Sequence, residues 1–274
     1  MNLFLSLLLF FYKFNLFRRI VPSIIRKFCS KKNHEITINN FKITLNVGSS
    51  IDREIFLKKI YDKDKFDYFE KKINLNDFDY FIDVGSYIGY YSLYLSSKYK
   101  NLKVISFEPI TESFNLINKS KKINNLNNLE LNNYALSNIE GETKFWVTDN
   151  NKKSGYSFFK KDDFNNELKN NNYDYNNLIF RNIKTRIFDN IYTIKKKKIF
   201  IKIDVERHEF EALLGCKNFL KDSENLIFLQ IEIVDRLENK VLDLLKSYNF
   251  KKINRIYPTD KRGGCDFYLT NYNL

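Results

Sequence analysis

Short apolar runs alternate with amphipathic stretches along most of this chain from residue 80 onward. The runs have the length of β-strands, and the stretches between them carry apolar residues at helical spacing. We expect strands at residues 80–84, 103–107, 129–135, 199–205 and 226–233, with a final pair near 250–256 and 265–269. We expect helices at 90–97, 111–124, 209–220 and 236–248. This alternation predicts an α/β fold built from βαβ units around a mainly parallel sheet.

Two segments depart from this rhythm. Residues 36–47 alternate apolar and polar side chains around Asn39-Asn40, which predicts a β-hairpin, and a helical stretch follows over 52–73. Residues 141–192 contain a polar, Asn- and Lys-rich segment between two expected strands. We interpret this second stretch as an insertion over one end of the sheet, where it could form a substrate lid.

The chain begins with a basic and apolar arm. Residues 3–12 are almost wholly apolar, but such a run has about half the length that a helix needs to cross a bilayer. Apolar residues then recur with helical period up to Phe28, and Pro22 predicts a kink or the start of a second helix. A basic amphipathic helix of this kind can lie on an anionic membrane surface or dock on the protein's own core. The periodicity leaves both alternatives open.

These patterns give the expected organisation of the 274 residues. We expect an arm over 1–35 and one domain over 36–274, in which 36–78 form an N-terminal hairpin and helix and 141–192 form the insertion.

Composition and charge argue against several classes of function. The net charge is +13, and the first 33 residues hold seven basic residues and no acid. No nucleic-acid-binding motif is visible, so we expect no nucleic-acid partner. The three cysteines have no metal-ligand spacing, which argues against zinc and disulfides and for a reducing compartment. We therefore expect a cytoplasmic protein, with peripheral membrane contact through residues 1–30 as an open alternative.

The most informative motif follows the first strand of the α/β region. Asp83 is followed by Gly85 and Gly89, and a helix begins directly after them. Glycine lets a backbone turn approach a ligand closely, and a helix N-terminus offers free N–H groups. A carboxylate at this turn would repel a pyrophosphate but suits a ligand with an ammonium and a sulfonium group. This pattern favours S-adenosylmethionine over NAD, whose GxGxxG fingerprint is absent.

Two further strand ends carry acidic residues. Glu108 ends the next strand, where doubly wound folds place the carboxylate that binds the cofactor's ribose. The strand at 199–205 ends in Asp204, with Glu206 on the same face and His208 at the start of the next helix. These three are the candidate general bases for an acceptor hydroxyl, in that order. We expect no metal ligand set, although two converging carboxylates leave a metal-assisted reaction open.

Together the segments FIDVGSYIGYYS, VISFEP, NYALSNIEG and IKIDVERHEFEALLG resemble the FkbM-type class I S-adenosylmethionine-dependent methyltransferases over roughly residues 41–270. The resemblance implies a Rossmann-like, doubly wound sheet of seven strands and methylation of hydroxyl oxygens on sugars, glycans or secondary metabolites. By position it implies a cofactor turn, a ribose ligand and an adenine-lining segment. These residues are Asp83, Gly85, Ser86 and Gly89 for the turn, Glu108 for the ribose, and Asn133 to Ala135 for the adenine. It also implies that Asp204 and Glu206 face the methyl group and the acceptor.

Two positions depart from the family pattern. Arg207 stands where the family usually has glycine, and Tyr87 lies within the cofactor turn. Arg207 could reshape the acceptor pocket, bind an anionic acceptor or mark a loss of activity, and Tyr87 could narrow the cofactor site or point outward. The favoured function is an O-methyltransferase that uses S-adenosylmethionine. The alternative is a non-catalytic, membrane-associated interaction protein that keeps the fold.

Overall fold

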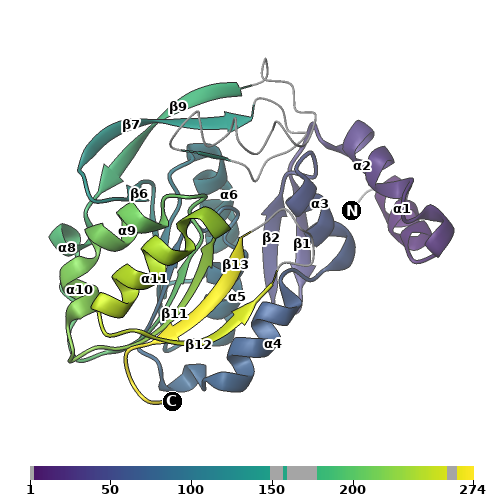
Figure 1. Ribbon diagram of the computed structural model, residues 1–274. Coiled ribbons are helices and arrows are strands. Elements are labelled where there is room, and N and C mark those ends of the chain that lie inside the picture. Colours follow the sequence, from purple (N-terminus) through teal and green to yellow (C-terminus); the bar gives the residue numbers. More distant parts are fainter. Residues whose placement is uncertain (1–2, 149–156, 159–177, 258–263) are drawn as a thin grey trace.

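The computed structural model describes residues 3–148, 157–158, 178–257 and 264–274. Its centre is a seven-stranded sheet in the order β12-β13-β11-β10-β3-β4-β5 (Figure 1). The strands are β3 (Tyr80–Val84), β4 (Lys103–Phe107), β5 (Leu129–Asn132), β10 (Lys198–Ile203), β11 (Leu226–Ile233), β12 (Lys251–Ile256) and β13 (Cys265–Thr270). All pairs from β11 to β5 are parallel, whereas β13 is antiparallel to both β11 and β12. The predicted Rossmann-like, mainly parallel sheet of seven strands is confirmed.

Helices cover both faces of this sheet because successive side chains of each strand point in opposite directions. Phe81 and Phe200 belong to the core layer under α4 (Lys63–Lys72) and α5 (Tyr90–Lys98). Ile82 and Ile201 belong to the opposite layer, under α9 (Glu209–Gly215), α10 (Lys217–Lys221) and α11 (Glu238–Ser247). Figure 1 shows the two groups of helices on either side of the sheet.

The strand order places a topological switch between β3 and β10. The chain passes from β3 to β4 and β5 on one side, with α6 (Thr111–Ile123) between these two strands, and returns to β10 on the other side of β3. Ligands of open α/β sheets bind beyond the carboxyl ends of the strands at such a switch. Asp83, near the end of β3, and Asp204, directly after β10, therefore lie at the expected position for a site.

Three expected helices are divided in the structure. The stretch at 52–73 forms two helices, α3 (Ser50–Lys58) and α4, because Lys59 takes a left-handed conformation with φ 60° and ends α3. The stretch at 209–220 is broken at Cys216 into α9 and α10. The stretch at 236–248 begins as the 3₁₀ turn η4 (Asp235–Leu237) before α11. Hydrophobic periodicity continues across each break, which is why the pattern alone joined them.

A second sheet lies at the edge of the domain, in the order β6-β9-β7-β8. It contains β6 (Ala135–Leu136), β7 (Gly141–Thr148), β8 (Ser157–Phe158) and β9 (Leu178–Arg186), and α8 (Phe188–Ile191) follows it. The expected strand at 129–135 is thus wrong in its extent, because β5 ends at Asn132 and Ala135 pairs with β9 instead. Much of the segment interpreted as a lid, residues 149–156 and 159–177, lies outside the described residues.

The N-terminal region packs beside α5. The predicted hairpin is β1 (His34–Ile38) and β2 (Phe41–Leu45), joined at Asn39-Asn40. The arm folds into α1 (Leu3–Tyr12), the 3₁₀ turn η1 (Asn15–Phe17) and α2 (Val21–Cys29), with Pro22 in the first turn of α2. Pro22 therefore starts a second helix rather than kinking one. Among the described residues, no helix has the length and apolar character needed to span a bilayer.

Candidate functional site

The turn from β3 to α5 is built around two glycines. Gly85 and Gly89 have φ of 85° and 75°, in the left-handed region that favours glycine. A Cβ on Gly85 would lie 1.9 Å from the carbonyl oxygen of Asp204, so the turn touches the end of β10 directly. Ser86 is buried, and its backbone N–H and hydroxyl both donate to the carbonyl of Phe107 at the end of β4. The turn is therefore held between β4 and β10, at the switch point.

Asp83 lies under this turn with one carboxylate oxygen unpaired. Ser92 Oγ donates to Asp83 Oδ2 at 2.6 Å, whereas Oδ1 is buried and has no hydrogen-bond partner among the described residues. Burial raises the pKa of the Asp83 carboxyl, although Lys202 beside it acts in the opposite direction. A buried unpaired acceptor is costly unless a ligand supplies the missing donor. Asp83 thus fits a group that donates hydrogen bonds or carries positive charge.

Glu108 joins the loops at the ends of β3 and β4. Its two carboxylate oxygens accept hydrogen bonds of 2.8 Å from the backbone N–H groups of Tyr87 and Ile110. Burial raises the pKa of Glu108 to about 8, even though both hydrogen bonds favour the charged form. Glu108 therefore shapes the cofactor turn, and each of its oxygens keeps a second lone pair for a ligand hydroxyl.

Tyr87 points away from the turn toward α3. Its hydroxyl donates to Asp52 Oδ1 at 2.7 Å and lies 2.7 Å from Ser49 Oγ, the N-cap of α3. Burial raises the pKa of Asp52, while the hydrogen bond from Tyr87 lowers it. Of the two alternatives for Tyr87, the structure supports the one in which the side chain leaves the turn, and it ties the turn to the N-terminal helices.

In the segment 133–135, which we expected to line the adenine, the side chains of Asn133 and Ala135 contact other parts of the protein. Asn133 Nδ2 donates to the carbonyls of Glu108 and Pro109 at 2.9 and 3.1 Å, so it fixes the loop after β4. Ala135 is buried with Phe145 and Ile183 under the second sheet. Asn133 thus lies beside Glu108, whereas Ala135 belongs to the neighbouring apolar cluster.

A row of polar side chains crosses the buried sheet below the site. Asp83 is in register with Ser106 on β4 and with Lys202 on β10, and Lys202 is in register with Gln230 on β11. All four are nearly inaccessible to solvent, and Lys202 lies 5.0 Å from the ring centre of Tyr91 on α5. Residues in register on neighbouring strands point to the same face, so this row faces α4 and α5.

Lys65 on α4 completes an ion-pair network that the sequence pattern does not reveal. Its ammonium lies 2.7 Å from Asp266 Oδ2, 3.5 Å from Asp62 Oδ2 and 3.7 Å from Glu232 Oε2. Burial alone would lower the pKa of Lys65, but these carboxylates raise it. α4 precedes β3 in the sequence and lies far from β11 and β13 along the chain, so only the fold brings these charges together.

Asp204 and Glu206, the two favoured candidate bases, differ in their electrostatics. Asp204 Oδ2 accepts a hydrogen bond of 3.0 Å from Lys202 Nζ. Burial by itself would raise the pKa of Asp204, but Lys202 and Lys65 outweigh it and lower this pKa. Burial raises the pKa of Glu206 well above its usual range, and the carboxylates around it raise it further. Glu206 therefore holds a proton more tightly than Asp204, and it can act as a base only in its deprotonated form.

Further acids surround Glu206. Burial raises the pKa of Glu209 to about 7 and that of Glu232 to about 8, and Asp204 adds to both shifts. The network contains two lysines and an excess of acids, namely Asp62, Asp83, Asp204, Glu206, Glu209, Glu232 and Asp266 with Lys65 and Lys202. A cationic ligand would compensate this excess of negative charge.

The loop after Asp204 is strained. Glu206 and Arg207 have φ of 50° and 74°, a conformation that non-glycine residues adopt at an energetic cost. Glycine adopts this conformation without that cost, which agrees with the glycine that the resemblance implies at position 207. The Arg207 N–H donates to Glu209 Oε1 at 2.9 Å, which helps to hold the loop.

His208, the third candidate base, is directed toward the second sheet. Its Nε2 lies 3.0 Å from Ser137 Oγ, and its Nδ1 lies 3.8 Å from Glu211 Oε2. These contacts join the start of α9 to the segment after β6. Among the described residues, no group of three or more His, Cys, Asp or Glu side chains is arranged to hold a metal ion.

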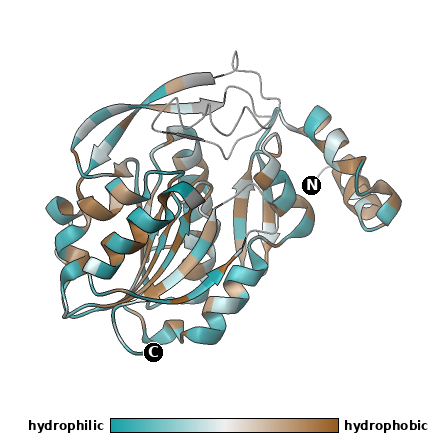
Figure 2. Cartoon of the chain, in the orientation of Figure 1, coloured by the Kyte–Doolittle hydropathy of each residue, from teal (hydrophilic) through white to brown (hydrophobic). Residues whose placement is uncertain are grey.

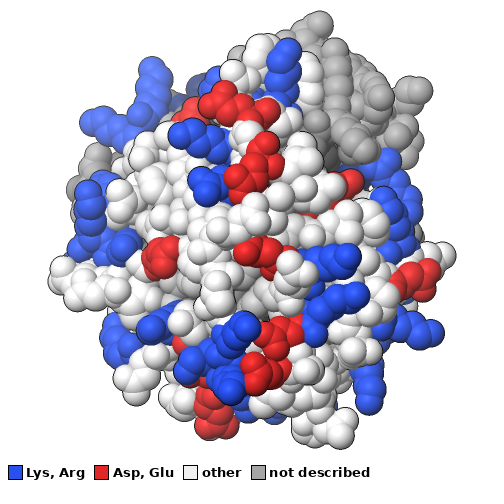
Figure 3. Space-filling view, turned by 90° about the vertical axis from the view of Figure 1, so that its left-hand side faces the viewer, with Lys and Arg blue, Asp and Glu red and all other residues white. Residues whose placement is uncertain are grey.

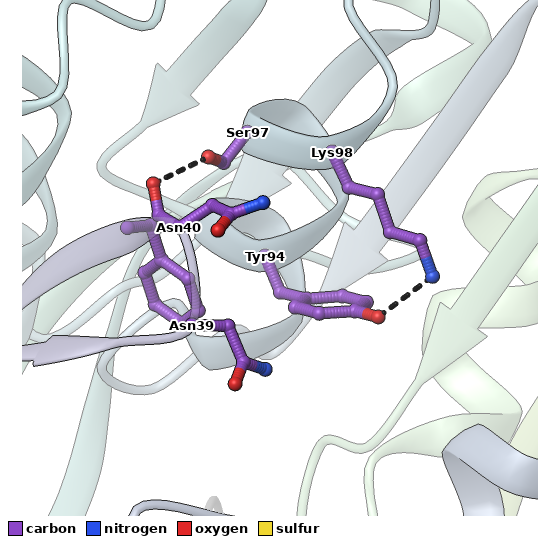
Figure 4. Close-up of a pocket in the computed structure, with 6 residues that line it drawn as sticks. Asn39, Asn40, Tyr94, Ser97 and Lys98 are labelled. Atoms are coloured by element: carbon purple, nitrogen blue, oxygen red, sulfur yellow. Dashed lines mark hydrogen bonds between the residues drawn. The ribbon is translucent and has the colours of Figure 1, made fainter.

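A small surface pocket lies elsewhere, between the hairpin turn and the end of α5 (Figure 4). Ser97 Oγ donates to the carbonyl of Asn40 at 3.3 Å, and Lys98 Nζ donates to Tyr94 Oη at 2.9 Å. None of the residues that line it belongs to the site described above.

Comparisons with known proteins place the chain among methyltransferases. The family described as "Methyltransferase FkbM domain" matches residues 83–252. "Methyltransferase 1" of Beauveria bassiana (strain ARSEF 2860) is 24% identical over 201 residues, which are 69% of this chain and 74% of that protein.

Two solved structures illustrate the structural likeness. The methyltransferase FkbM from Methylobacillus flagellatus KT has a TM-score of 0.48 and 16% identity, over 72% of this chain and 45% of that one. This chain thus spans less than half the length of that structure. Precorrin-6y C5,15-methyltransferase from Geobacter metallireducens GS-15 has a TM-score of 0.43 and 13% identity, over 78% and 90% of the two chains.

Proposed function

Because the chain belongs to the FkbM methyltransferase family, we propose that it transfers a methyl group from S-adenosylmethionine to a hydroxyl oxygen of a sugar, glycan or secondary metabolite. The observation that carries the proposal is the acid-rich site at the switch between β3 and β10, with the unpaired Asp83 Oδ1 beneath the glycine turn. Such a site favours a ligand with positive charge over a dinucleotide with a negative pyrophosphate.

The residues of the first two strand ends fit this cofactor. Asp83 would accept hydrogen bonds from the cofactor's ammonium group, and the backbone of the turn at Gly85, which has no side chain, would approach the cofactor closely. The free lone pairs of Glu108 would accept the ribose hydroxyls, and Asn133 keeps this carboxylate's loop in place. When bound, S-adenosylmethionine supplies a methyl group on a positively charged sulfur, which an oxygen nucleophile can displace.

The acids after β10 would act on the acceptor. In its deprotonated form Glu206, the more basic of the two acids, would take the proton of the attacking hydroxyl, which makes the oxygen a stronger nucleophile. Asp204 is paired with Lys202, so its charge would orient the acceptor rather than receive a proton. Orientation of the two reacting atoms supplies most of the rate enhancement in this kind of transfer.

The first test is calorimetric titration with S-adenosylmethionine and, separately, with NAD. We expect S-adenosylmethionine alone to bind, and Asp83→Asn to weaken its affinity by about 30-fold or more because the buried charge is lost. Ser106→Ala is the matched control, since Ser106 neighbours Asp83 in the same buried row and its hydroxyl also has no hydrogen-bond partner in the described parts of the chain. Binding of NAD, or of neither compound, would overturn the proposal and favour an interaction protein.

The second test identifies the acceptor. Purified protein is incubated with S-adenosylmethionine carrying a labelled methyl group and with panels of sugars, glycans and hydroxylated metabolites. Label transferred to an oxygen supports the proposal, whereas transfer to nitrogen or carbon would contradict the hydroxyl assignment.

A further inference from the structure

The N-terminal arm, here meaning residues 3–29 with α1, η1 and α2, exposes an apolar surface that no described part of the chain covers. Among the described residues, thirteen large apolar side chains are exposed, and seven of them lie in the arm. They are Phe4, Leu7, Phe10, Phe14, Leu16, Ile20 and Phe28, with exposed fractions from 42% to 77%. Figure 2 shows the arm at the edge of the molecule, with α1 mostly apolar and α2 of mixed character. A contiguous apolar surface of this kind marks an interaction site.

The inner side of the same arm is docked on the domain. Leu5 and Leu8 of α1 and Val21 and Ile25 of α2 are buried in the core that also holds the hairpin and α5. α1 contacts α2, and α2 contacts α3. The domain thus fixes the arm in place, and the exposed side chains are the outer face of folded helices.

The composition of α1 shows that its outer face is unsuited to water. Its sequence LFLSLLLFFY has no charged residue and only Ser6 and Tyr12 with polar groups. Helices at a protein surface normally carry a charged face, and a helix that is apolar all round is normally buried. Leu7 and Phe10, at helical spacing, are both about half exposed. The outer face of α1 therefore needs an apolar environment from outside the chain.

The charges around this face identify the environment. Seven basic residues follow α1 along the chain. Three lie before α2, and four lie in α2 or just after it: Lys13, Arg18 and Arg19, then Arg26, Lys27, Lys31 and Lys32. All seven are exposed, and none forms an ion pair with a described acidic side chain. On the face of the molecule shown in Figure 3, by contrast, acidic and basic side chains are interspersed.

We propose that the arm's outer face binds the surface of an anionic phospholipid bilayer. Its apolar side chains would enter the boundary between headgroups and acyl chains, and its seven basic residues would contact the phosphate groups. The exposed side chains of this arm are mostly apolar or cationic, and none is acidic, which matches the acyl-chain boundary and the phosphate layer of an anionic bilayer. The docking is independent of the identity of the methyl acceptor.

The arm's outer face is connected to the cofactor turn through α2 and α3. α2 contacts α3, and the N-terminal residues of α3 bind the Tyr87 hydroxyl of the cofactor turn. A bilayer at the arm would thus lie on the side of the domain that carries α3, within two helices of the turn.

Sedimentation with phospholipid vesicles tests the proposal on the full chain. We expect the protein to sediment with phosphatidylglycerol–phosphatidylcholine vesicles, less with phosphatidylcholine alone, and less at high salt. Leu7→Gln with Phe10→Gln should lower the partition coefficient by about tenfold or more. Arg18→Gln with Arg19→Gln should lower it by roughly fivefold for each residue, as expected for a basic side chain at an anionic surface.

Matched controls come from exposed positions elsewhere. Ile139→Gln replaces an apolar side chain that is 59% exposed, and Lys71→Gln with Lys72→Gln neutralises an exposed basic pair on α4. Both should bind vesicles like the unaltered protein, and all variants should keep its melting temperature and affinity for S-adenosylmethionine.

Three results would overturn the proposal. The protein could stay in the supernatant with anionic vesicles, or the folded arm variants could bind as well as the controls. Sedimentation velocity could also reveal a dimer that Leu7→Gln with Phe10→Gln dissociates, which would assign the surface to a second copy of the chain.

Discussion

At the scale of single residues, the site depends on carboxyl groups whose surroundings give them different proton affinities. Asp204 faces Lys202 and has a lowered pKa, while burial and neighbouring acids raise the pKa of Glu206. Two acids that stand close together can divide the tasks of charge and proton transfer in this way. The distinction depends on which side chains meet in space.

For Glu206 we expect a loss of turnover without a loss of cofactor binding. Glu206→Gln keeps the shape of the side chain but cannot accept a proton, so kcat should fall about 100-fold or more. The dissociation constant for S-adenosylmethionine should change by less than about threefold. Calorimetry and a labelled-methyl assay on the identified acceptor measure the two quantities. Glu224→Gln, at an exposed acid remote from the network, is the control; equal turnover of both variants would remove Glu206 from the proton transfer.

For Arg207 we expect a gain in stability on replacement by glycine. The residue has φ 74°, so Arg207→Gly should relieve strain of about 1 kcal/mol and raise the melting temperature. Arg207→Ala removes the same side chain but keeps the strained conformation, and it should not be stabilised. Thermal unfolding measures both variants, and equal melting temperatures for them would show that the backbone conformation costs little.

At the scale of elements, the close approach of the β3–α5 turn to the end of β10 holds the cofactor side and the acceptor side together. Gly85 permits this contact because it has no side chain. Glu108 adds a second connection by bonding the loops after β3 and β4. Three strand ends thus form one rigid edge of the sheet.

Replacement of Gly85 by alanine should separate these elements. The new Cβ would meet the Asp204 carbonyl oxygen at 1.9 Å, so the turn or β10 must shift. We expect a loss of stability of about 2 kcal/mol or more and at least a tenfold weaker affinity for S-adenosylmethionine. Gly141→Ala is the matched control, since Gly141 also has positive φ but no atom within 4 Å of the added Cβ. If both variants behaved alike in unfolding and titration, the close approach would be unimportant.

At the scale of the whole molecule, the excess of buried acids connects protonation, stability and ligand binding. Glu209 and Glu232 have pKa values of about 7 and 8 because burial favours their neutral forms. In the unfolded chain both acids lose their protons at lower pH. Their contribution to stability is therefore complete below the unfolded pKa values and is lost as pH rises through 7 and 8.

Cofactor binding should show the opposite dependence on pH. Deprotonated Glu209 and Glu232 attract a cation, so the affinity for S-adenosylmethionine should rise on the order of tenfold from pH 6 to 8.5, while the unliganded protein becomes less stable. Thermal unfolding with and without the cofactor measures both trends, and the stabilisation by cofactor should grow with pH. Glu232→Gln should reduce the rise in affinity at the upper end of this pH range. If the affinity did not depend on pH in either the unaltered protein or Glu232→Gln, the charges of these acids would not contribute to cofactor binding.

The sequence by itself determined the α/β class and the position of the glycine turn, because strand and helix periodicities and glycine spacing are local properties, and its resemblance to a known family implied the sheet of seven strands. It also predicted that Asp83, Glu108, Asp204 and Glu206 meet at one edge of the sheet, where acids at the ends of parallel strands gather; their roles in binding and catalysis stay predictions.

Only the tertiary structure decided the rest. Lys65 reaches Asp266 across about two hundred intervening residues, and His208 turns toward Ser137, because packing of distant helices and strands sets these contacts. The breaks at Lys59 and Cys216 were invisible to periodicity, since hydrophobic spacing records which side is buried and not where the backbone bends. In the arm, periodicity revealed an apolar face, and only the fold showed which side chains the domain covers and which remain for a partner.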